Sequence, residues 1–335
     1  MENESKIAIV IVNWNAGDSL YRCLQSAVNQ TVSPHRVILI DNASADDSLE
    51  GVSSAFPNVE IIRQTVNLGF AEGNNLAVEA ADDCEWIAFL NPDAFAEADW
   101  IEQLSLASRK HPEFSFFGSR MSMDKNPGIL DGTGDSYHVS GLAWRRDHGV
   151  EEVKTPRSSG EIFAPCAASA MIRRKDFLEL GGFDKRFFCY FEDVDLAFRL
   201  RLKGGRCYFV SSAKVSHLGS GTTERNSDFS VYHGNRNMVW AYIKNMPAYL
   251  FWIYLPQHLL ANIAALIWYS LRGQGKTIFQ AKWDAIKGIP FAWRQRKEIQ
   301  AGSKSKPSDL RRVFLKGLFL PYLKSKRTSS FNAER

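Results

Sequence analysis

The sequence predicts an α/β fold built around a parallel sheet, and two observations support this prediction. Over roughly the first hundred residues, short apolar runs alternate with stretches of helical spacing, a pattern typical of strands joined by crossover helices. Polar residues follow several of the apolar runs directly, as at the ligand-binding edge of such a sheet. The chain has 335 residues, 45% of them hydrophobic, which suffices for one large domain with an appendage or for two domains.

The predicted elements follow one another along that first segment. The apolar runs that read as buried strands are residues 7–12, 37–40, 59–62 and 86–90. The stretches with helical spacing are residues 19–29, 47–56, 72–81 and 99–110. Because strands that alternate with helices lie parallel, we expect helices to cover both faces of this sheet.

Asparagine or aspartate closes three of these strands, in the stretches "VNWNA", "LIDNAS" and "FLNPDA". Turn chemistry explains any one of the three equally well, since Asn, Asp and Pro are common in loops. Together they favour a ligand site at the carboxyl edge of the sheet. Asp41 is suited to accept from a base or a ribose hydroxyl, and Asp93 to hold a divalent metal beside a departing diphosphate. His217 in "SAKVSHLGSG" is a candidate second ligand, although a lone histidine beside a strand is more often structural.

Two common nucleotide-binding motifs are missing from the sequence. No G-x-G-x-x-G follows the first predicted strand, and no G-x-x-x-x-G-K-[ST] occurs. The phosphate cradles of nicotinamide enzymes and of P-loop ATPases are therefore excluded.

The stretch "CYFEDVDLAFRL", residues 189–200, sets Glu192, Asp193 and Asp195 among aromatic and aliphatic residues. These acids favour the start of a helix that runs to Lys203 and stops at two glycines. Asp195 and Arg199 stand four residues apart on that helix, so they are expected to pair on one face. A helix start accounts well for Asp195 and poorly for Glu192, which leaves the function of the other acids open at this point.

The end of the chain differs from its beginning in charge and hydropathy. Residues 271–335 contain sixteen Lys or Arg and four acids, a balance of +12, whereas the preceding residues carry −8. Such a tail points to a polyanionic partner, either nucleic acid or an anionic membrane. Residues 247–271 are long and apolar enough to span a bilayer, but Pro, Gln, His and Asn interrupt them. The N-terminus lacks the basic region of a secretory signal, and the five scattered cysteines favour a reducing compartment.

Several motifs give the chain a resemblance to a known family. The sequence contains, in order, "IVNWNA", "LIDNASADDS", "NLGFAEGNN", "FLNPDA", "GGFDKRFFCYFEDVDLAFRLRLKGGRCYFVSSAKVSHLGSG" and "HGNRNMVW". This order and spacing resemble those of family 2 glycosyltransferases, and most closely those of bacterial rhamnosyltransferase-like members that build cell-surface polysaccharides. The resemblance covers residues 6–240 and implies a GT-A fold, in which a nucleotide-binding sheet flanked by helices precedes an acceptor-binding half.

The resemblance also implies roles for individual residues. The family's D-x-D motif corresponds to "NPD" here, with Asn91 in place of the first Asp, so Asp93 becomes the main carboxylate ligand of a Mg²⁺ or Mn²⁺ ion and His217 its partner. The remaining positions that match the nucleotide-sugar site are Asn13, Asn15, Asp41, Asn67, Gly69 and Asn74.

The acids of "CYFEDVDLAFRL" gain a function from this resemblance. By motif match Asp193 is the general base that takes a proton from the acceptor hydroxyl during inverting transfer, and Glu192 orients the acceptor or the base. Partial desolvation by the aromatic rim raises the basicity of such a carboxylate. The rim residues are Phe187, Phe188, Tyr190 and Phe191. Asp195 keeps its structural role on the helix face.

The middle segment "LDGTGDSYHVSGLAWRRDHG" resembles the family's variable donor or acceptor region. Its charged residues that are candidates for contacting sugar or diphosphate are Asp131, Asp135, Arg145 and Arg146. A plain surface loop explains such a Gly-rich polar stretch more often.

These inferences combine into one predicted enzyme. Residues 1–240 form the catalytic domain, and residues 241–335 form a helical, basic, membrane-associating region. The protein is expected to move rhamnose from dTDP-rhamnose, or alternatively a hexose from a UDP-sugar, to a glycan or lipid-linked acceptor. We expect it to bind an anionic membrane surface and not nucleic acid. Its expected location is the cytoplasmic face of the bacterial inner membrane, in a peripheral or monotopic arrangement. A sugar nucleotidyltransferase and a non-catalytic sugar-binding module are weaker alternatives, as is a soluble helical subdomain for the tail.

Overall fold

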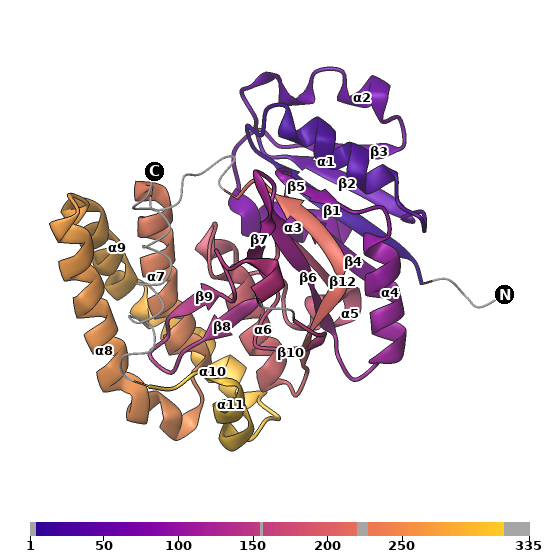
Figure 1. Cartoon of the computed structure of the whole chain (residues 1–335). Coiled ribbons are helices and arrows are strands. Elements are labelled where there is room, and N and C mark those ends of the chain that lie inside the picture. Colours follow the sequence, from indigo (N-terminus) through magenta and orange to yellow (C-terminus); the bar gives the residue numbers. More distant parts are fainter. Residues whose placement is uncertain (1–4, 155–156, 220–226, 318–335) are drawn as a thin grey trace.

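The computed structural model describes residues 5–154, 157–219 and 227–317, with helices and strands labelled as in Figure 1. Within these residues the strands are β1 (Ile7–Asn13), β2 (Arg36–Asp41), β3 (Val59–Arg63), β4 (Trp86–Leu90), β5 (Ala94–Ala96), β6 (Phe116–Met123), β7 (Asn126–Gly132), β8 (Asp135–Tyr137), β9 (Ala143–Arg145), β10 (Gly160–Ile162), β11 (Ser169–Arg173) and β12 (Cys207–His217). The α-helices are α1 (Ser19–Val28), α2 (Val52–Ala55), α3 (Gly69–Ala80), α4 (Trp100–Lys110), α5 (Arg174–Glu179), α6 (Glu192–Leu202), α7 (Asp228–Asn245), α8 (Ala248–Leu271), α9 (Gly275–Lys287), α10 (Ile289–Ala301) and α11 (Pro307–Val313).

One twisted sheet forms the centre of the molecule, with strand order β10-β12-β6-β11-β4-β1-β2-β3 (Figure 1). The four strands predicted from apolar runs are confirmed as β1 to β4, and they pair in parallel. The remainder of the sheet, beyond the segment from which parallel strands were predicted, is mixed. Strand β7 returns from β6 after only Asp124 and Lys125, a connection that permits only an antiparallel pair. Strand β11 lies antiparallel between β4 and β6.

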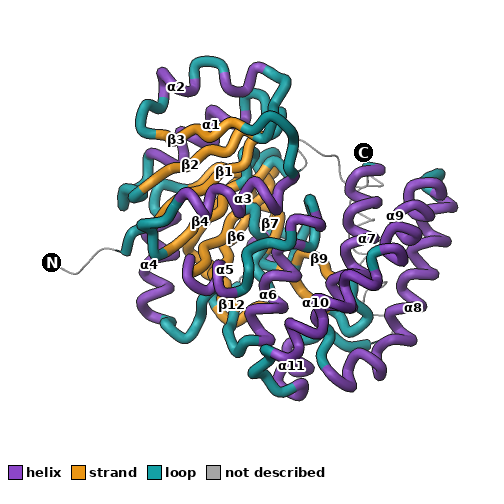
Figure 2. The backbone as a smooth tube through the Cα atoms, turned by 180° about the vertical axis from the view of Figure 1, so that it is seen from behind, coloured by secondary structure: helices purple, strands orange, loops and turns teal. Residues whose placement is uncertain are grey.

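Both faces of the sheet are buried, as the unbroken apolar run of β1 requires. Ala8, Val10 and Val12 belong to one core cluster, which also receives side chains from α3, α6 and α7. Ile7 and Ile9 point the other way into a second cluster with α1 and α4. Because successive strand residues alternate between faces, a strand covered on both sides must be apolar at every position. Figure 2 shows α3, α5 and α6 lying over the face opposite to α1 and α4.

One predicted helix is interrupted. The helix expected over residues 47–56 consists of a 3₁₀ turn at Asp47–Leu49 followed by the short α2. Gly51 between them adopts φ +69°. This left-handed conformation ends one helical segment before the next begins.

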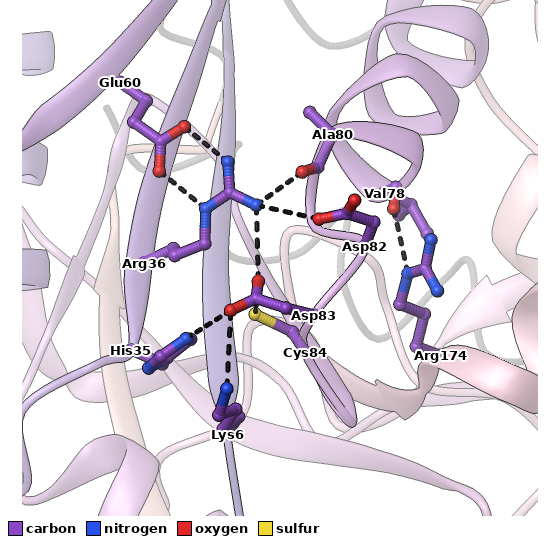
Figure 3. A network of polar contacts seen from close by, with 10 residues as sticks. All are labelled: Lys6, His35, Arg36, Glu60, Val78, Ala80, Asp82, Asp83, Cys84 and Arg174. Carbon is purple, nitrogen blue, oxygen red and sulfur yellow. Dashed lines mark hydrogen bonds and ion pairs between the residues drawn. The ribbon is translucent and has the colours of Figure 1, made fainter.

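The amino edge of the parallel strands is closed by ion pairs (Figure 3). Arg36 at the start of β2 pairs with Glu60 of β3 and reaches Asp83 in the α3–β4 loop. His35 and Lys6 also contact the Asp83 carboxylate, at 2.6 and 3.5 Å. These contacts join three strands at the edge remote from the polar strand ends, which leaves the carboxyl edge for a ligand.

The C-terminal helices pack against the sheet domain through α7. Trp240 Nε1 donates to the Ala285 carbonyl of α9 at 3.0 Å, and Arg296 of α10 donates to the Ile243 carbonyl at 2.9 Å. Helix α7 itself continues across residue 240 as far as Asn245. The division of functions between residues 1–240 and 241–335 stays a prediction.

Candidate active site

A cavity of about 530 Å³ opens at the carboxyl ends of β1, β2 and β4. Its floor includes Asn91 and Asp93 after β4, and its rim includes Phe229 and Val231 of α7. The acidic, arginine and histidine residues that line it are Asp93, Asp131, Asp135, Arg145, His148, Glu192, Asp193 and His217. Seven of them form two groups, which we call the histidine wall (Asp93, Asp131, Arg145 and His217) and the acid wall (Asp135, Glu192 and Asp193).

Strand pairing brings the two predicted metal ligands of the histidine wall together. Residue Ala94 of β5 pairs with His217 at the end of β12, and the Leu218 amide donates to the Asp93 carbonyl at 3.0 Å. As a result Nε2 of His217 lies 3.3 Å from Oδ1 of Asp93. The two residues are 124 positions apart in the sequence, so the fold alone makes them neighbours.

Asp131 supports the histidine from behind. Nδ1 of His217 lies 2.9 Å from Oδ2 of Asp131, and because an ionised carboxylate only accepts, Nδ1 is the protonated nitrogen. Nε2 is then directed into the cavity, and it has no hydrogen-bond partner among the described residues. A buried imidazole nitrogen left in this way beside a carboxylate suits a divalent cation, and a carboxylate behind the histidine is the usual outer-shell arrangement of such sites.

Charge neighbours control the pKa values on the histidine wall. Burial alone would raise the pKa of Asp131, but Arg145, His148 and His217 outweigh it and hold that pKa well below its usual range. Burial alone would lower the pKa of His217, but the carboxylates of Asp131 and Asp93 raise it to about 9. The imidazole is therefore protonated at neutral pH, and a cation that binds Nε2 would displace its proton. Asp131 is thus a permanent anion at neutral pH.

The acid wall is presented by a strained turn ahead of α6. Phe188, Tyr190 and Phe191 have φ values of 64°, 69° and 71°, which bulky residues rarely adopt. The helix begins at Glu192, so the carboxylates of Glu192 and Asp193 lie in its first turn. Backbone amides hold Asp193 in place, since Oδ1 accepts from Val194 at 2.8 Å and Oδ2 from Ala167 at 3.1 Å.

The acids on this wall are more basic than ordinary carboxylates. Burial, together with the charge of Asp193, raises the pKa of Glu192 well above its usual value. Burial also raises the pKa of Asp193, although its amide donors and Arg145 oppose the rise. Burial and the charge of Asp193 raise the pKa of Asp135 to about 7. Ligand atoms of Asp135, Cys166 and Asp193 lie within 4.8 Å of one another, so these carboxylates interact directly.

The third acid of the motif has the structural role predicted for it. Asp195 is fully buried and lies 2.8 Å from Nε of Arg199, which confirms the expected pair. It also accepts from Lys244 at 3.0 Å and from Asn245 at 2.7 Å on α7. Because these cations outweigh its burial, the pKa of Asp195 is lowered. The helix predicted from Glu192 to Lys203 is confirmed as α6, with Lys203 as its C-cap.

The loop between β3 and α3 forms the side of the cavity where Asn67 and Gly69 lie. Nδ2 of Asn42 donates to Oδ1 of Asn67 at 2.9 Å and to the Gly69 carbonyl at 3.1 Å. Gly69 has φ +82°, and a Cβ there would lie 2.5 Å from the ring of Phe188. Only glycine allows this loop to pack against the strained turn.

Four predicted nucleotide-site residues do not line this cavity. Nδ2 of Asn13 donates to the hydroxyls of Ser44 and Ser48, and Oδ1 of Asn15 accepts from the Ala45 amide. Asp41 accepts from the Ser44 amide at 3.3 Å. These three side chains gather around residues 44–48 beside the cavity. The fourth, Asn74, is buried in α3 and donates to the Phe70 carbonyl.

The middle segment contributes more than the sequence indicated. Asp131, Asp135 and Arg145 line the cavity, whereas Arg146 turns away and donates to Thr133. Asn42 was missed, although it belongs to the "LIDNAS" stretch. Tyr269 of α8 also lines the cavity, and no feature of its apolar helix signals this position.

The sequence is similar to a known family and to known proteins. The sequence pattern of the family described as "Glycosyl transferase family 2" matches residues 8–181, and that of "Glycosyl transferase family group 2" matches residues 137–293. The N-acetylglucosaminyl-diphospho-decaprenol L-rhamnosyltransferase of Mycobacterium tuberculosis is 28% identical over 251 residues, covering 68% of this chain and 81% of the relative. Rhamnosyltransferase WbbL of Escherichia coli is 28% identical over 226 residues, covering 63% of this chain and 83% of the relative.

A solved structure supports the fold. The chain of GalNAc-T7, crystallised with UDP, GalNAc and Mn²⁺, superposes with a TM-score of 0.58 and 19% sequence identity over 72% of this chain. This chain spans about half of that one, 48% of its length. The similarity supports a GT-A architecture for the sheet and its helices.

Proposed function

The chain belongs to glycosyl transferase family 2, and we propose that it transfers a sugar, with inversion, from a nucleotide sugar to a glycan or lipid-linked acceptor. It is a rhamnosyltransferase-like glycosyltransferase of GT-A fold. The observation that supports the reaction best is the division of one cavity into two walls. One wall is suited to a metal ion and a diphosphate, and the other carries carboxyls of raised pKa suited to a proton transfer.

The acid wall supplies the base in this proposal. Asp193 takes the proton of the acceptor hydroxyl as that oxygen forms a bond to the anomeric carbon. The bond from the anomeric carbon to the phosphate oxygen breaks, and the nucleoside diphosphate leaves with the electron pair. The amides of Ala167 and Val194 fix the Asp193 carboxylate, and Glu192 beside it orients the acceptor or the base. No covalent nucleophile is needed.

The histidine wall would hold a divalent cation, Mg²⁺ or Mn²⁺, through Asp93 and Nε2 of His217. When bound, such an ion neutralises the charge that develops on the departing diphosphate. Asp131 accepts from Nδ1 of His217, so Nε2, which faces Asp93, is the nitrogen that would bind the ion once its proton is displaced. Arg145, which lines the same wall, adds a fixed positive charge near the diphosphate.

The donor site in this proposal lies on the side of Asn67, Gly69 and Asn91, with Asn13, Asn15, Asp41 and Asn74 supporting the loops around the nucleoside. The favoured donor is dTDP-rhamnose, because two relatives that match this chain over most of their own length are named rhamnosyltransferases. A UDP-hexose is the alternative donor. The acceptor class follows the relative whose name specifies a diphospho-decaprenol-linked sugar.

A donor panel tests this assignment. Full-length protein is incubated with dTDP-rhamnose, UDP-glucose, UDP-galactose and UDP-N-acetylglucosamine in the presence of Mn²⁺, and released nucleoside diphosphate is measured with and without a polyprenyl-diphospho-sugar acceptor. We expect acceptor-stimulated release with dTDP-rhamnose only, and a rate at least about 10²-fold lower from Asp193→Asn. If only a UDP-sugar gives stimulated release, the donor is that UDP-sugar and not dTDP-rhamnose. If no donor gives release, the proposed reaction is refuted.

We also propose that the C-terminal helices lie on the cytoplasmic face of an anionic membrane. Among the described residues, fourteen of the twenty exposed large apolar side chains lie on α8, α9 and α10. Helix α8 is long and apolar enough to span a bilayer by length and composition, and 28% of its most apolar window is buried. However, α7 before it and α9 after it contact each other, with Lys282 Nζ bonded to Asn235 and Tyr232 to Asp284. The chain thus returns to the same side, which favours a helix in the interface over a crossing.

Liposome sedimentation tests the membrane proposal. Wild-type protein should pellet with anionic vesicles at low salt, and partly at high salt because apolar burial adds to charge attraction. The variant Trp252→Ser/Ile263→Ser removes two exposed α8 side chains and should stay largely in the supernatant. Leu106→Ser, an equally exposed position on α4 across the molecule, is the control (Figure 1). Wild-type protein in the supernatant at both salt concentrations would make the tail a packing subdomain.

A further inference from the structure

The turn that presents the acid wall needs an external support. Three of the four residues before Glu192 have positive φ angles, and all three are aromatic. Such a conformation costs energy at each position and persists only where surrounding groups hold it. The groups that hold it therefore also determine where the Asp193 carboxylate lies.

The main support comes from Asn237 in α7. Its side chain is fully buried, and its Nδ2 donates to the carbonyl oxygens of Phe187 at 2.9 Å, Cys189 at 2.9 Å and Tyr190 at 2.8 Å. The side-chain amide thus donates to three backbone carbonyls within residues 187–190. Because the amide has only two hydrogens, two of the carbonyls share one of them. The sequence motif "HGNRNMVW" contains this residue, and neither the donor site nor the acid wall accounts for it.

The opposite side of the same turn rests on the donor loop. The Phe188 carbonyl accepts from the Ala71 amide at 3.1 Å, and the Phe188 ring fills the space that a Cβ at Gly69 would need. The turn is therefore fixed between α7 and the β3–α3 loop. A shift of the turn would move Asp193 relative to a donor bound beside Asn67 and Gly69.

From these contacts we infer that Asn237 is a positioning residue, which fixes the position of the Asp193 carboxylate relative to the bound donor. It acts through the backbone of residues 187–190 and touches neither the donor nor the acceptor. The inference rests on the proposed function, because it assigns to Asn237 the geometry of the proposed base. Reactions that depend on orientation lose rate steeply when a catalytic group moves by a fraction of its contact distance.

Helix α7 provides a matched control. Asn245 lies two turns further along, is also fully buried, and its Nδ2 donates to Oδ1 of Asp195 at 2.7 Å. Replacing either asparagine removes the same amide donor from the same helix and takes hydrogen bonds away from buried acceptors. Of these two asparagines, Asn237 is the one that bonds to the strained turn.

The test compares Asn237→Ala with Asn245→Ala in the full-length chain. Binding of dTDP with Mn²⁺ counts the folded sites by calorimetry, and kcat per folded site and the donor KM are then measured. For Asn237→Ala we expect kcat per site to fall about 10²-fold with KM and dTDP affinity unchanged, as expected for a small displacement of a catalytic group. Hydrogen exchange of the peptide covering residues 187–195 should accelerate. Asn245→Ala should lower the melting temperature and leave kcat per site near that of wild type.

Asn237→Ser, which keeps one hydroxyl donor, should recover part of the lost kcat, and it serves as the test if Asn237→Ala does not fold. Unchanged kcat per site in the serine and alanine variants, or a parallel loss of dTDP affinity, would overturn the inference. Equal loss of kcat in Asn245→Ala would reduce Asn237 to a residue of general stability. Failure of the proposed function is seen separately, because wild-type protein would then release no nucleoside diphosphate from any donor.

Discussion

Asp131 and Glu192 are both buried on the lining of one cavity, and their pKa values move in opposite directions. Asp131 has Arg145, His148 and His217 around it, so its charged form is stabilised. Glu192 faces the charge of Asp193, and its Oε2 has no hydrogen-bond partner among the described residues. Burial alone does not determine the state of a carboxylate, and the neighbouring charges decide between an anion and a proton acceptor.

This difference assigns separate tasks to the two walls. Carboxylates that stay ionised suit a site that balances a cation and a diphosphate, whereas carboxyls with raised pKa suit proton transfer near neutral pH. Arg145 joins the walls, because it pairs with Asp131 and also contacts Cys166, which lies within 4.8 Å of Asp135 and Asp193. The variants below ask whether the two walls can be disabled independently.

Removing the metal should have the largest effect. We expect excess chelator to reduce transfer to background, and Mg²⁺ or Mn²⁺ to restore it. Asp93→Ala and His217→Ala should each weaken nucleoside diphosphate binding in the presence of Mn²⁺ by more than the about 10- to 100-fold typical of an outer-shell loss, and change nucleoside binding little. Calorimetry with dTDP and with thymidine measures the loss of diphosphate affinity separately from any loss of nucleoside affinity. Full activity in excess chelator, or an equal loss of thymidine affinity, would contradict the assignment of the histidine wall.

Asp193→Asn should disable the acid wall without disturbing the other. We expect kcat to fall by about 10²- to 10⁴-fold, the usual cost of losing a general base. Binding of dTDP with Mn²⁺ should remain near wild type, since the histidine wall is intact. The matched variant is Glu192→Gln, which should cost less. If Glu192→Gln is the more damaging change, or if Asp193→Asn keeps full turnover, Asp193 is not the base.

Asp131→Asn should weaken the histidine wall by an intermediate amount. Without the carboxylate behind it, His217 loses the partner that fixes its tautomer, and metal affinity should fall about 10- to 100-fold. The measurement is Mn²⁺ binding by electron paramagnetic resonance, which needs no turnover. Asp147→Asn is the control, because Asp147 lies in the same segment and pairs with Arg157 but does not contact His217. Equal losses in both variants would mean that Asp131 acts only through the stability of the segment.

The sequence predicted one part of this site well and another part poorly, for physical reasons. Strands β1 to β4 followed from unbroken apolar runs, and Asp93 followed from the motif after β4. His217, Glu192 and Asp193, which the structure also places on the cavity lining, followed from motifs shared with the family. The outer-shell contact of Asp131 did not, because it joins residues 86 positions apart through a sheet register that local patterns do not encode. The same holds for Tyr269, which reaches the cavity from an apolar helix that gives no polar signal.

Other differences between the predicted and the observed structure arose where a local feature interrupted or limited a sequence pattern. Helical spacing over residues 47–56 was correct on either side of Gly51, but the left-handed backbone of that glycine divides the helix. The alternation of strands and helices over the first hundred residues predicted the parallel pairing of β1 to β4 correctly. The pattern ends before β6, where a short connection to β7 requires an antiparallel pair. The polar residues after β1 and β2 were recognised as a group, and their mutual hydrogen bonds are visible only in the structure.

The smallest predicted effect is a change in melting temperature at neutral pH, and it has opposite signs when Glu192 and Asp195 of α6 are neutralised. The pKa of Glu192 is raised in the folded state, so the native protein binds more protons than the unfolded chain, and the free energy of unfolding falls as the pH rises above about 4.3, the unfolded value. Glu192→Gln removes this loss, and its melting temperature should exceed that of wild type at pH 7–8 by about 2–4 °C for each ~1 kcal/mol regained, with the difference vanishing near pH 4. Asp195 has a lowered pKa, so its contribution to stability is present above its unfolded value of about 3.9 and is lost as the pH falls through the folded value. Asp195→Asn, which leaves Lys244 and Arg199 without their anion, should therefore melt below wild type at pH 7 and approach it in acid. Scanning calorimetry of both variants from pH 2 to 8 checks the signs, because the Asp195 contribution is lost only below about pH 3.9. A Glu192→Gln protein less stable than wild type at pH 7–8 would show that Glu192 is held as a paired anion and that the two walls do not differ in the way described.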